Sequence, residues 1–151
     1  MQLNLSNKVL LFMLLLYMKL LMKKLVMKKE KNPTILIVDD EKINIIYLNA
    51  IVKRLDGFTP NILIARNGKE AVDQCRDNEI DLILMDIRMP VMDGLEATRK
   101  IKSFNHGIFI IVQTAFSTPQ DKALAFESGC DDFISKPINK EELFKKIKSY
   151  I

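Results

Sequence analysis

From residue 33 to residue 151, short apolar runs rich in Ile, Leu and Val alternate with longer segments in which apolar residues recur at helical spacing. The short runs predict buried β-strands, and the longer segments predict amphipathic helices. A strand followed by a helix, repeated five times, predicts an α/β domain whose parallel sheet is covered on both faces through right-handed crossovers. We expect strands at 34–38, 62–65, 81–85, 108–113 and 133–134, and helices at 41–55, 68–77, 95–101, 119–127 and 140–150.

The charged residues divide the chain into two pieces of different chemistry. The whole chain carries 23 Lys and Arg against 19 Asp and Glu, a formal net charge of +4. Seven Lys and one Glu lie in residues 1–32, so residues 33–151 hold 16 basic and 18 acidic side chains. We therefore expect a basic leader at 1–32 and one globular domain at 33–151, whose slight excess of acid argues against binding nucleic acid.

The leader starts with an apolar stretch and ends in a Lys-rich one. Residues 9–18 form an apolar run that ends at Lys19, which is short for a bilayer-spanning helix of about 20 residues. Most of the basic residues follow this run, and no small-residue cleavage site is visible, so the pattern argues against export. Phe12 and Leu15 share a helical stripe with lysines, which weakens the case for an interfacial helix.

Two interpretations of residues 1–32 therefore stay open. The segment is either a helix that associates with a membrane or an over-extended start in front of the MKKEKN sequence at Met27. We expect the domain in the cytoplasm, tethered to a membrane in the first case. The two cysteines, Cys75 and Cys130, match neither a metal-binding nor a redox spacing, so we expect a reducing compartment or two packed thiols.

Charged and hydroxyl side chains follow the predicted strands at the points where they end. The carboxyl ends of parallel strands meet at one edge of a sheet, and ligands of such folds bind there. We therefore expect these side chains to converge on one site. They are Asp39, Asp40 and Glu41 after the first strand, Asp86 after the third, Thr114 and Ala115 after the fourth, and Lys136 and Pro137 after the fifth.

The acids in this set favour a particular ligand. Carboxylates within a few Å of one another repel by roughly 1–4 kcal/mol per pair unless a cation lies among them. An acidic first loop also repels a bare phosphate, which disfavours a nucleotide or flavin site of the glycine-rich kind. Mg²⁺ prefers carboxylate and phosphate oxygens as ligands. The sequence therefore predicts a Mg²⁺ site that also receives a phosphoryl group.

The same edge holds a nucleophile and its supporting groups. Asp86, at the end of the central strand, is placed to attack phosphorus and form an acyl phosphate, while Lys136 and Thr114 stabilise the phosphoryl oxygens. Each residue alone has a simpler interpretation: Asp40 as a helix cap, Thr114 as a bonded strand hydroxyl and Lys136 as a solvated surface charge. Their joint position at the strand ends favours the functional interpretation.

Four motifs with this order and spacing make residues 33–151 resemble the receiver domain of two-component response regulators. They are ILIVDDE (35–41), LILMDIRMPVMDGLEATRKI (82–101), TA (114–115) and FISKP (133–137). The resemblance implies a flavodoxin-like, doubly wound sheet of strand order 2-1-3-4-5. It implies that Asp86 is phosphorylated and that Mg²⁺ is bound by Asp39, Asp40, Asp86 and the backbone carbonyl of Arg88. It also implies that Thr114, Ala115 and Lys136 contact the phosphate. The supporting residues would be Glu41, Pro90, Gly94 and Pro137.

The resemblance also implies a switch. Phosphorylation draws Thr114 toward the phosphoryl group, and Phe133 turns into the space and alters the face formed by 119–127, 133–134 and 140–150. The family pattern implies a cis peptide bond before Pro137. Arg88 and Phe116 lie two positions beyond Asp86 and Thr114, and we expect them to restrict the hydrolytic water and slow dephosphorylation.

The expected function is a phosphoacceptor in a phosphorelay whose partner is a histidine kinase or a histidine phosphotransfer protein. We expect no output domain after the receiver, which suits a stand-alone regulator or the receiver of a hybrid kinase, as a monomer or a weak phosphorylation-dependent dimer. Such a domain is no enzyme beyond its own Mg²⁺-dependent phosphorylation and dephosphorylation. The alternative is an aspartate-nucleophile phosphohydrolase of haloacid dehalogenase type, but Arg88 stands where that family has a second Asp.

Overall fold

The computed structural model describes residues 5–30, 32–115 and 118–151, with side chains described outside residues 23–30. The chain forms two compact units, Met1–Asn32 and Pro33–Ile151. The second unit holds the sheet.

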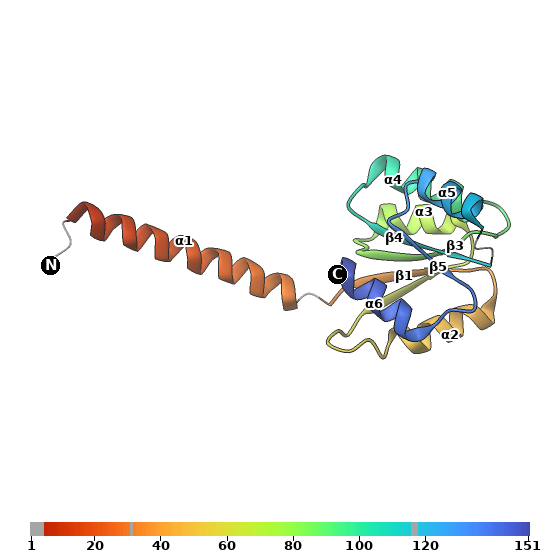
Figure 1. The fold of residues 1–151 in the computed structure, drawn as a ribbon, viewed down its shortest axis with the longest axis horizontal. Coiled ribbons are helices and arrows are strands. Elements are labelled where there is room, and N and C mark those ends of the chain that lie inside the picture. The colour runs from red at the N-terminus through yellow and green to blue at the C-terminus, as the bar shows by residue number, and fades with distance from the viewer. Residues whose placement is uncertain (1–4, 31, 116–117) are drawn as a thin grey trace. The chain divides into compact units, whose positions relative to one another are not determined.

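Five parallel strands form one sheet in the order β2-β1-β3-β4-β5 (Figure 1). The order 2-1-3-4-5 and the doubly wound architecture confirm the predicted fold class. β1 and β3 are central and their residues are almost entirely buried, which explains their unbroken apolar sequence. The strands are β1 (Thr34–Val38), β2 (Asn61–Ala65), β3 (Leu82–Asp86), β4 (Phe109–Thr114) and β5 (Asp132–Ser135).

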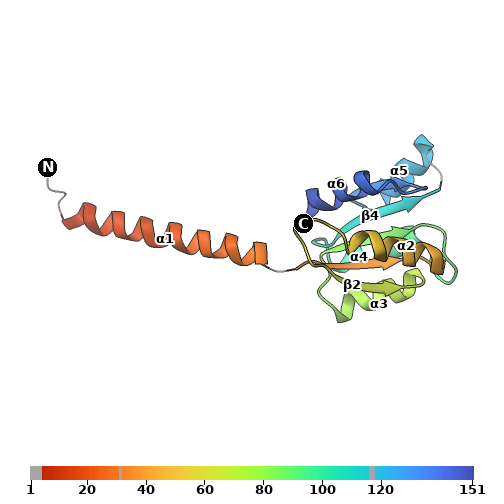
Figure 2. The ribbon, with the colours of Figure 1, turned by 90° about the horizontal axis from the view of Figure 1, so that it is seen from below.

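Helices cover both faces of the sheet, which Figure 1 shows edge-on, and Figure 2 is the view from the side of α2 and α6. One face packs against α2 and α6, with Leu48 and Leu143 in its core, and the other against α3, α4 and α5, with Val72 and Ile101 in its core. The helices of this unit are α2 (Lys42–Val52), α3 (Gly68–Asp77), α4 (Gly94–Phe104), α5 (Pro119–Glu127) and α6 (Lys140–Tyr150). Cys75 and Cys130 are free and buried, and burial raises their pKa values to about 12 and about 11.

The predicted bounds of β1, α3, α5 and α6 match the structure, and the others differ by one to three residues at an end. The predicted helix 41–55 is too long, because α2 ends at Val52 and the chain then turns. Arg54 and Leu55 donate to the carbonyls of Ile51 and Val52, three residues back, so the apolar period continues through a turn that is no longer α-helical.

The first unit contains one long helix, α1 (Leu5–Glu30). Its segment Leu5–Met22 has a mean hydropathy of 1.6 and is long and apolar enough to cross a membrane. The interruption of the apolar residues by Lys19 predicted a poor membrane span, whereas α1 continues through Lys19 without a break.

Candidate functional site

Asp39 is the first residue of the site and lies immediately after β1. Its side chain is only 1% exposed. Its carboxylate accepts a hydrogen bond from the backbone N–H of Glu41 (2.9 Å) and two from the Asn44 side-chain amide (3.1 and 3.2 Å). These bonds fix the Asp39 carboxylate at the carboxyl edge of the sheet.

Asp40 is exposed and does not cap the helix that follows. The N-cap residue of α2 is Glu41, whose side chain makes no capping hydrogen bond. The simpler interpretation of Asp40 as a helix cap is therefore wrong, and its carboxylate is available to the site.

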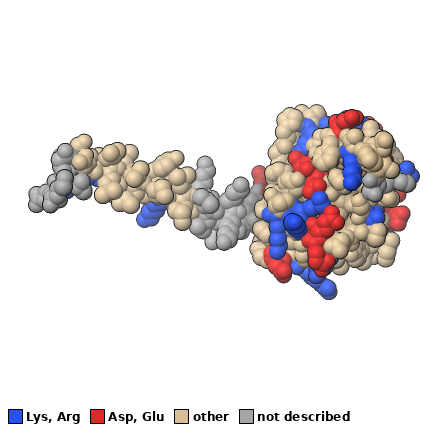
Figure 3. Space-filling model, in the orientation of Figure 1, with Lys and Arg blue, Asp and Glu red and all other residues tan. Residues whose placement is uncertain are grey.

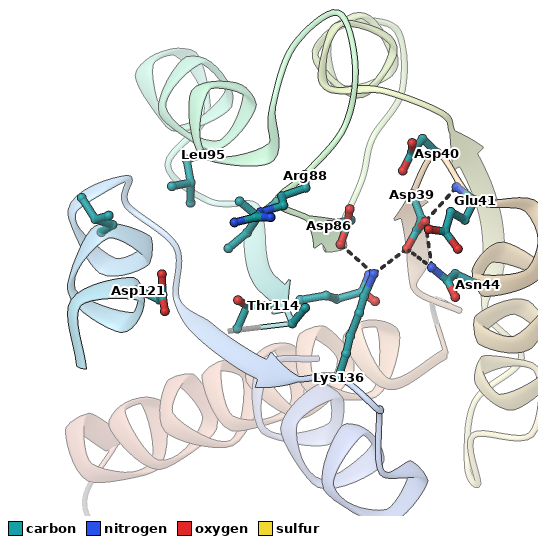
Figure 4. A pocket seen from close by; sticks show the side chains of 14 residues that line it. Asp39, Asp40, Glu41, Asn44, Asp86, Arg88, Leu95, Thr114, Asp121 and Lys136 are labelled. Carbon is teal, nitrogen blue, oxygen red and sulfur yellow. Dashed lines mark hydrogen bonds and ion pairs between the residues drawn. The ribbon is translucent and has the colours of Figure 1, made fainter. Parts of the chain in front are cut away.

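Asp86 is the last residue of β3 and is joined to Asp39 by one lysine (Figure 4). Lys136 Nζ lies 2.7 Å from Asp86 Oδ1 and 3.0 Å from Asp39 Oδ2. The Lys136 side chain is 24% exposed, so it is a half-buried ion-pair partner rather than a solvated surface charge.

Burial and neighbouring charges act on the titration of this pair in opposite directions. Burial raises the pKa of Asp86, the hydrogen bond and charge of Lys136 lower it, and the charges of Asp39 and Asp40 raise it, with a net increase. Burial lowers the pKa of Lys136, but the bonds to Asp86 and Asp39 outweigh this and the net pKa is raised. Lys136 is therefore a cation at neutral pH.

The three aspartates form a cluster that fits a divalent cation. One carboxylate oxygen from each of Asp39, Asp40 and Asp86 can be chosen so that all three lie within 4.8 Å of one another. Three acceptor-only groups at this spacing match the all-oxygen ligands that Mg²⁺ prefers. The positive charge of Lys136 offsets part of their repulsion.

A cavity of about 530 Å³ opens beside this cluster. Its lining includes Thr114, Ala115, Arg88 and Glu41. Thr114 is buried at the end of β4, and its carbonyl accepts a hydrogen bond from the Lys136 backbone N–H (2.8 Å). The cavity also has lining residues that the sequence argument did not include: Asn44, Ile87, Leu95, Gln113, Asp121 and Leu124.

Gly94 supports the site by allowing α4 to approach β3. A Cβ at this position would lie 1.9 Å from the carbonyl oxygen of Asp86. The Gly94 N–H donates to the Ile87 carbonyl at 2.8 Å, which holds the start of α4 against the end of the strand. Gly68 allows a similar close contact, which sequence reasoning missed. A Cβ at Gly68 would lie 2.6 Å from the carbonyl oxygen of Met92.

The remaining predicted residues lie around this centre. The peptide bond between Lys136 and Pro137 is cis, as the family pattern implied. Phe133 is half-buried in β5, with Lys122 Nζ 4.8 Å and Lys146 Nζ 5.6 Å from its ring centroid, and among the described residues it is not part of the cavity lining. Phe116 lies outside the described residues.

A doubly wound parallel sheet with three clustered aspartates and a bridging lysine at its carboxyl edge defines an α/β domain whose ligand site lies at the strand ends. A family model described as "Response regulator receiver domain" matches residues 35–148. The chain belongs to the response regulator receiver family. This membership gives no support to the alternative of a haloacid dehalogenase-type phosphohydrolase.

Curated relatives include regulators and a kinase. The two-component response regulator ORR41 of Oryza sativa subsp. japonica is 40% identical over 111 residues, which cover 72% of this chain and 87% of the relative. Histidine kinase 5 of Arabidopsis thaliana is 33% identical over 147 residues, which cover 79% of this chain and 16% of the kinase. The chain spans about a quarter of the length of the transcriptional regulatory protein ZraR of Klebsiella oxytoca, with 36% identity over 109 residues, 72% of this chain and 24% of ZraR.

Solved structures of receiver domains share the fold. The receiver of Ssk1 from Saccharomyces cerevisiae, crystallised with the histidine phosphotransfer signaling protein Ypd1, has a TM-score of 0.73 and 31% identity, covering 79% of this chain and 88% of that chain. The receiver of the sensor histidine kinase PA1611 from Pseudomonas aeruginosa, with magnesium in its active-site cleft, has a TM-score of 0.72 and 30% identity, covering 80% of this chain and 98% of that chain.

Proposed function

We propose that Asp86 accepts a phosphoryl group from a phosphohistidine donor in a phosphorelay. The observation that carries this proposal is the position of Lys136, whose ammonium group lies between the carboxylates of Asp86 and Asp39 beside an open cavity. An Asp86 carboxylate oxygen attacks phosphorus, the bond from phosphorus to the histidine nitrogen breaks, and its electron pair stays on the imidazole. The product is an acyl phosphate on Asp86 and a free histidine.

The remaining groups lower the charge that accumulates during transfer. Asp39, Asp40 and the free oxygen of Asp86 would hold Mg²⁺, with the Arg88 carbonyl as a further ligand, and the ion supplies charge neutralisation for the phosphoryl oxygens. Lys136 exchanges its contact with the Asp86 carboxylate for one with a phosphoryl oxygen. The Thr114 hydroxyl and the Ala115 backbone N–H donate hydrogen bonds to the other oxygens.

The donor protein docks on α2. Ile43 is 68% exposed, Ile46 52% and Tyr47 45%, and this apolar strip adjoins Glu41 and Asn44, which line the cavity. The Tyr47 hydroxyl donates to the Ile138 carbonyl (3.1 Å), which fixes the ring at the edge of the strip. A histidine kinase or a histidine phosphotransfer protein would cover this strip with apolar side chains of its own. The similar Ssk1 receiver was co-crystallised with the histidine phosphotransfer signaling protein Ypd1, which supports a partner of this class.

Phosphorylation changes the face formed by α5, β5 and α6. Thr114 moves toward the phosphoryl group, and Phe133 leaves the contacts it makes with the Lys122 and Lys146 ammonium groups and with Phe126 (ring centroids 5.8 Å apart). Each contact is worth about 0.5–1.5 kcal/mol at a partly exposed site, so the ring can leave them at a cost that an acyl phosphate can offset. The receiver acts in the cytoplasm, as a monomer or a weak phosphorylation-dependent dimer.

Chemical phosphorylation of the full chain tests this proposal. We expect Mg²⁺-dependent incorporation of acid-stable, base-labile phosphate from phosphoramidate, lost on addition of EDTA and in Asp86→Asn. Asp73→Asn is the matched control, because the Asp73 side chain is 50% exposed and pairs with Lys69 at the surface. Labelling of Asp86→Asn equal to that of the parent would show that another residue is the acceptor.

A further inference from the structure

The described side chains of α1 from Leu5 to Met22 are exposed on all sides of the helix. Sixteen of these 18 positions are uncharged and most are large and apolar, and Figure 3 shows the described part of the helix as an almost unbroken tan surface. A soluble amphipathic helix has a polar face, whereas a helix that is apolar all round is covered by protein or lipid. Protein or lipid must therefore cover Leu5–Met22 around its whole circumference.

The length of this segment matches a bilayer. At a rise of about 1.5 Å per residue, 18 residues span about 27 Å, close to the hydrocarbon thickness of about 30 Å. The two charges, Lys8 and Lys19, each lie three residues from one end of the segment, about 4.5 Å along the axis. Lysine side chains can extend over that distance and keep their ammonium groups at the interface.

The alternatives cover this surface less well. A second copy packed along one seam, as in a coiled coil, would leave the other apolar faces in water. A helix lying in the membrane surface would also expose half of its apolar side chains. Within the second unit, both sheet faces are already covered by its own helices. A spanning position is the arrangement that covers every face of the segment.

The charges beyond the segment indicate the orientation. Residues 23–32, directly after the segment, contain five Lys and one Glu. Positively charged flanks remain on the cytoplasmic side and are attracted to anionic headgroups. We propose that Leu5–Met22 crosses a lipid bilayer once, with the Lys-rich sequence that follows it and the receiver on the cytoplasmic side.

Tryptophan depth measurements test the spanning position, because the chain has no Trp of its own. Ser6→Trp, Met13→Trp and Met22→Trp place one reporter at each end and one in the middle of the segment. The full chain is reconstituted in vesicles of phosphatidylcholine and phosphatidylglycerol with bromine near the middle or the headgroup end of the acyl chains. We expect the indole fluorescence of the Met13→Trp protein to be quenched most by the deep bromine, and that of the two end variants by the shallow bromine. Equal shallow quenching in all three variants, or no quenching, overturns the proposal.

Two charge variants and a protease assay test insertion in cells and orientation. Leu11→Arg with Leu14→Arg should lower the fraction of chain that resists alkaline carbonate extraction by about tenfold, since two charges then lie near the bilayer centre. Ala50→Arg with Gln120→Arg adds the same charge at exposed receiver positions. This control should change the fraction of chain that resists extraction by less than about twofold. External protease should cleave the receiver only after spheroplasts are lysed. Cleavage before lysis would contradict the proposed orientation. Equal carbonate extraction of the two double variants would contradict the spanning position. Asp86→Asn should insert into the membrane like the parent, so a failure of the membrane proposal can be distinguished from a failure of the phosphorylation proposal.

Discussion

The ammonium group of Lys136 lies 2.7 Å from Asp86 Oδ1, in contact with the residue proposed to be phosphorylated. The same nitrogen contacts Asp39, whose side chain is 1% exposed, so one cation serves two buried carboxylates. Removing one partner of a buried ion pair leaves an uncompensated charge and usually destabilises a protein strongly. The resting site therefore depends on Lys136 wherever no divalent cation is present.

Lys136→Met should lower the free energy of unfolding by about 3 kcal/mol in Mg²⁺-free buffer, because Asp39 and Asp86 lose their shared cation. Millimolar Mg²⁺ should restore part of this loss, since a cation bound by the native carboxylates and not by the unfolded chain stabilises the fold. Urea unfolding with EDTA and with Mg²⁺ measures both effects.

Lys146→Met is the matched control for this change. Lys146 is also half-buried and pairs with Asp132 at 2.8 Å, but its partner is outside the aspartate cluster. Its loss of stability should be the same with and without Mg²⁺. A similar Mg²⁺ response in both variants would mean that the ion does not act at Asp39 and Asp86.

Gly94→Ala should lower the free energy of unfolding by about 3 kcal/mol and slow phosphorylation of Asp86. The new Cβ would lie 1.9 Å from the Asp86 carbonyl oxygen, so α4 has to move away from β3. Gly107→Ala is the control, because its nearest contact is the flexible Asn105 side chain at 3.4 Å. Urea midpoints and the phosphoramidate labelling rate measure the two effects; equal stability of both variants would disprove the steric argument.

The sheet and most of the site could be predicted because their signals are local in the sequence. Unbroken apolar runs identify buried parallel strands, and the topology then brings Asp39, Asp86 and Lys136 to one edge although Lys136 is 97 positions from Asp39. Only the residues at the end of each strand had to be identified in the sequence, because the parallel sheet brings the strand ends together at one edge.

The contacts that were missed depend on distances that a single sequence does not contain. Asn44 is an ordinary polar residue in the first turn of α2 until the carboxylate of Asp39 is placed beside it. The Asn67-Gly68 pair signals only a turn, whereas the steric constraint on Gly68 comes from Met92, in a loop 24 positions away. Helix ends were misjudged for a similar reason, because the apolar period of α2 continues past Val52.

Gln113→Leu should raise the free energy of unfolding by about 1 kcal/mol. Gln113 is fully buried in β4, and neither its amide nitrogen nor its amide oxygen has a hydrogen-bond partner among the described residues. A buried unsatisfied donor or acceptor costs about 1–3 kcal/mol, and an apolar group of similar size removes that cost.

Thr98→Val makes the same kind of change at a satisfied site. The buried Thr98 hydroxyl donates to the Gly94 carbonyl at 2.7 Å, so its replacement should lower the free energy of unfolding by about 1 kcal/mol. Thermal and urea unfolding of both variants should therefore shift in opposite directions. Destabilisation by Gln113→Leu as large as that by Thr98→Val would show that Gln113 is paired with water in the adjoining cavity.

Val91→Asn should stabilise the protein by about 1 kcal/mol, because Val91 has a φ of 72° and a β-branched side chain is strained in this left-handed region. Asn tolerates that conformation, and the Val91 side chain is 79% exposed, so little packing is lost. The measurement is the urea midpoint at an unchanged m value. Val91→Ala is the control, since Ala keeps a Cβ and its preference against positive φ. Equal gains in the two variants would assign the effect to removal of an exposed apolar group, whereas a gain confined to Asn assigns it to the backbone of the loop that follows Asp86.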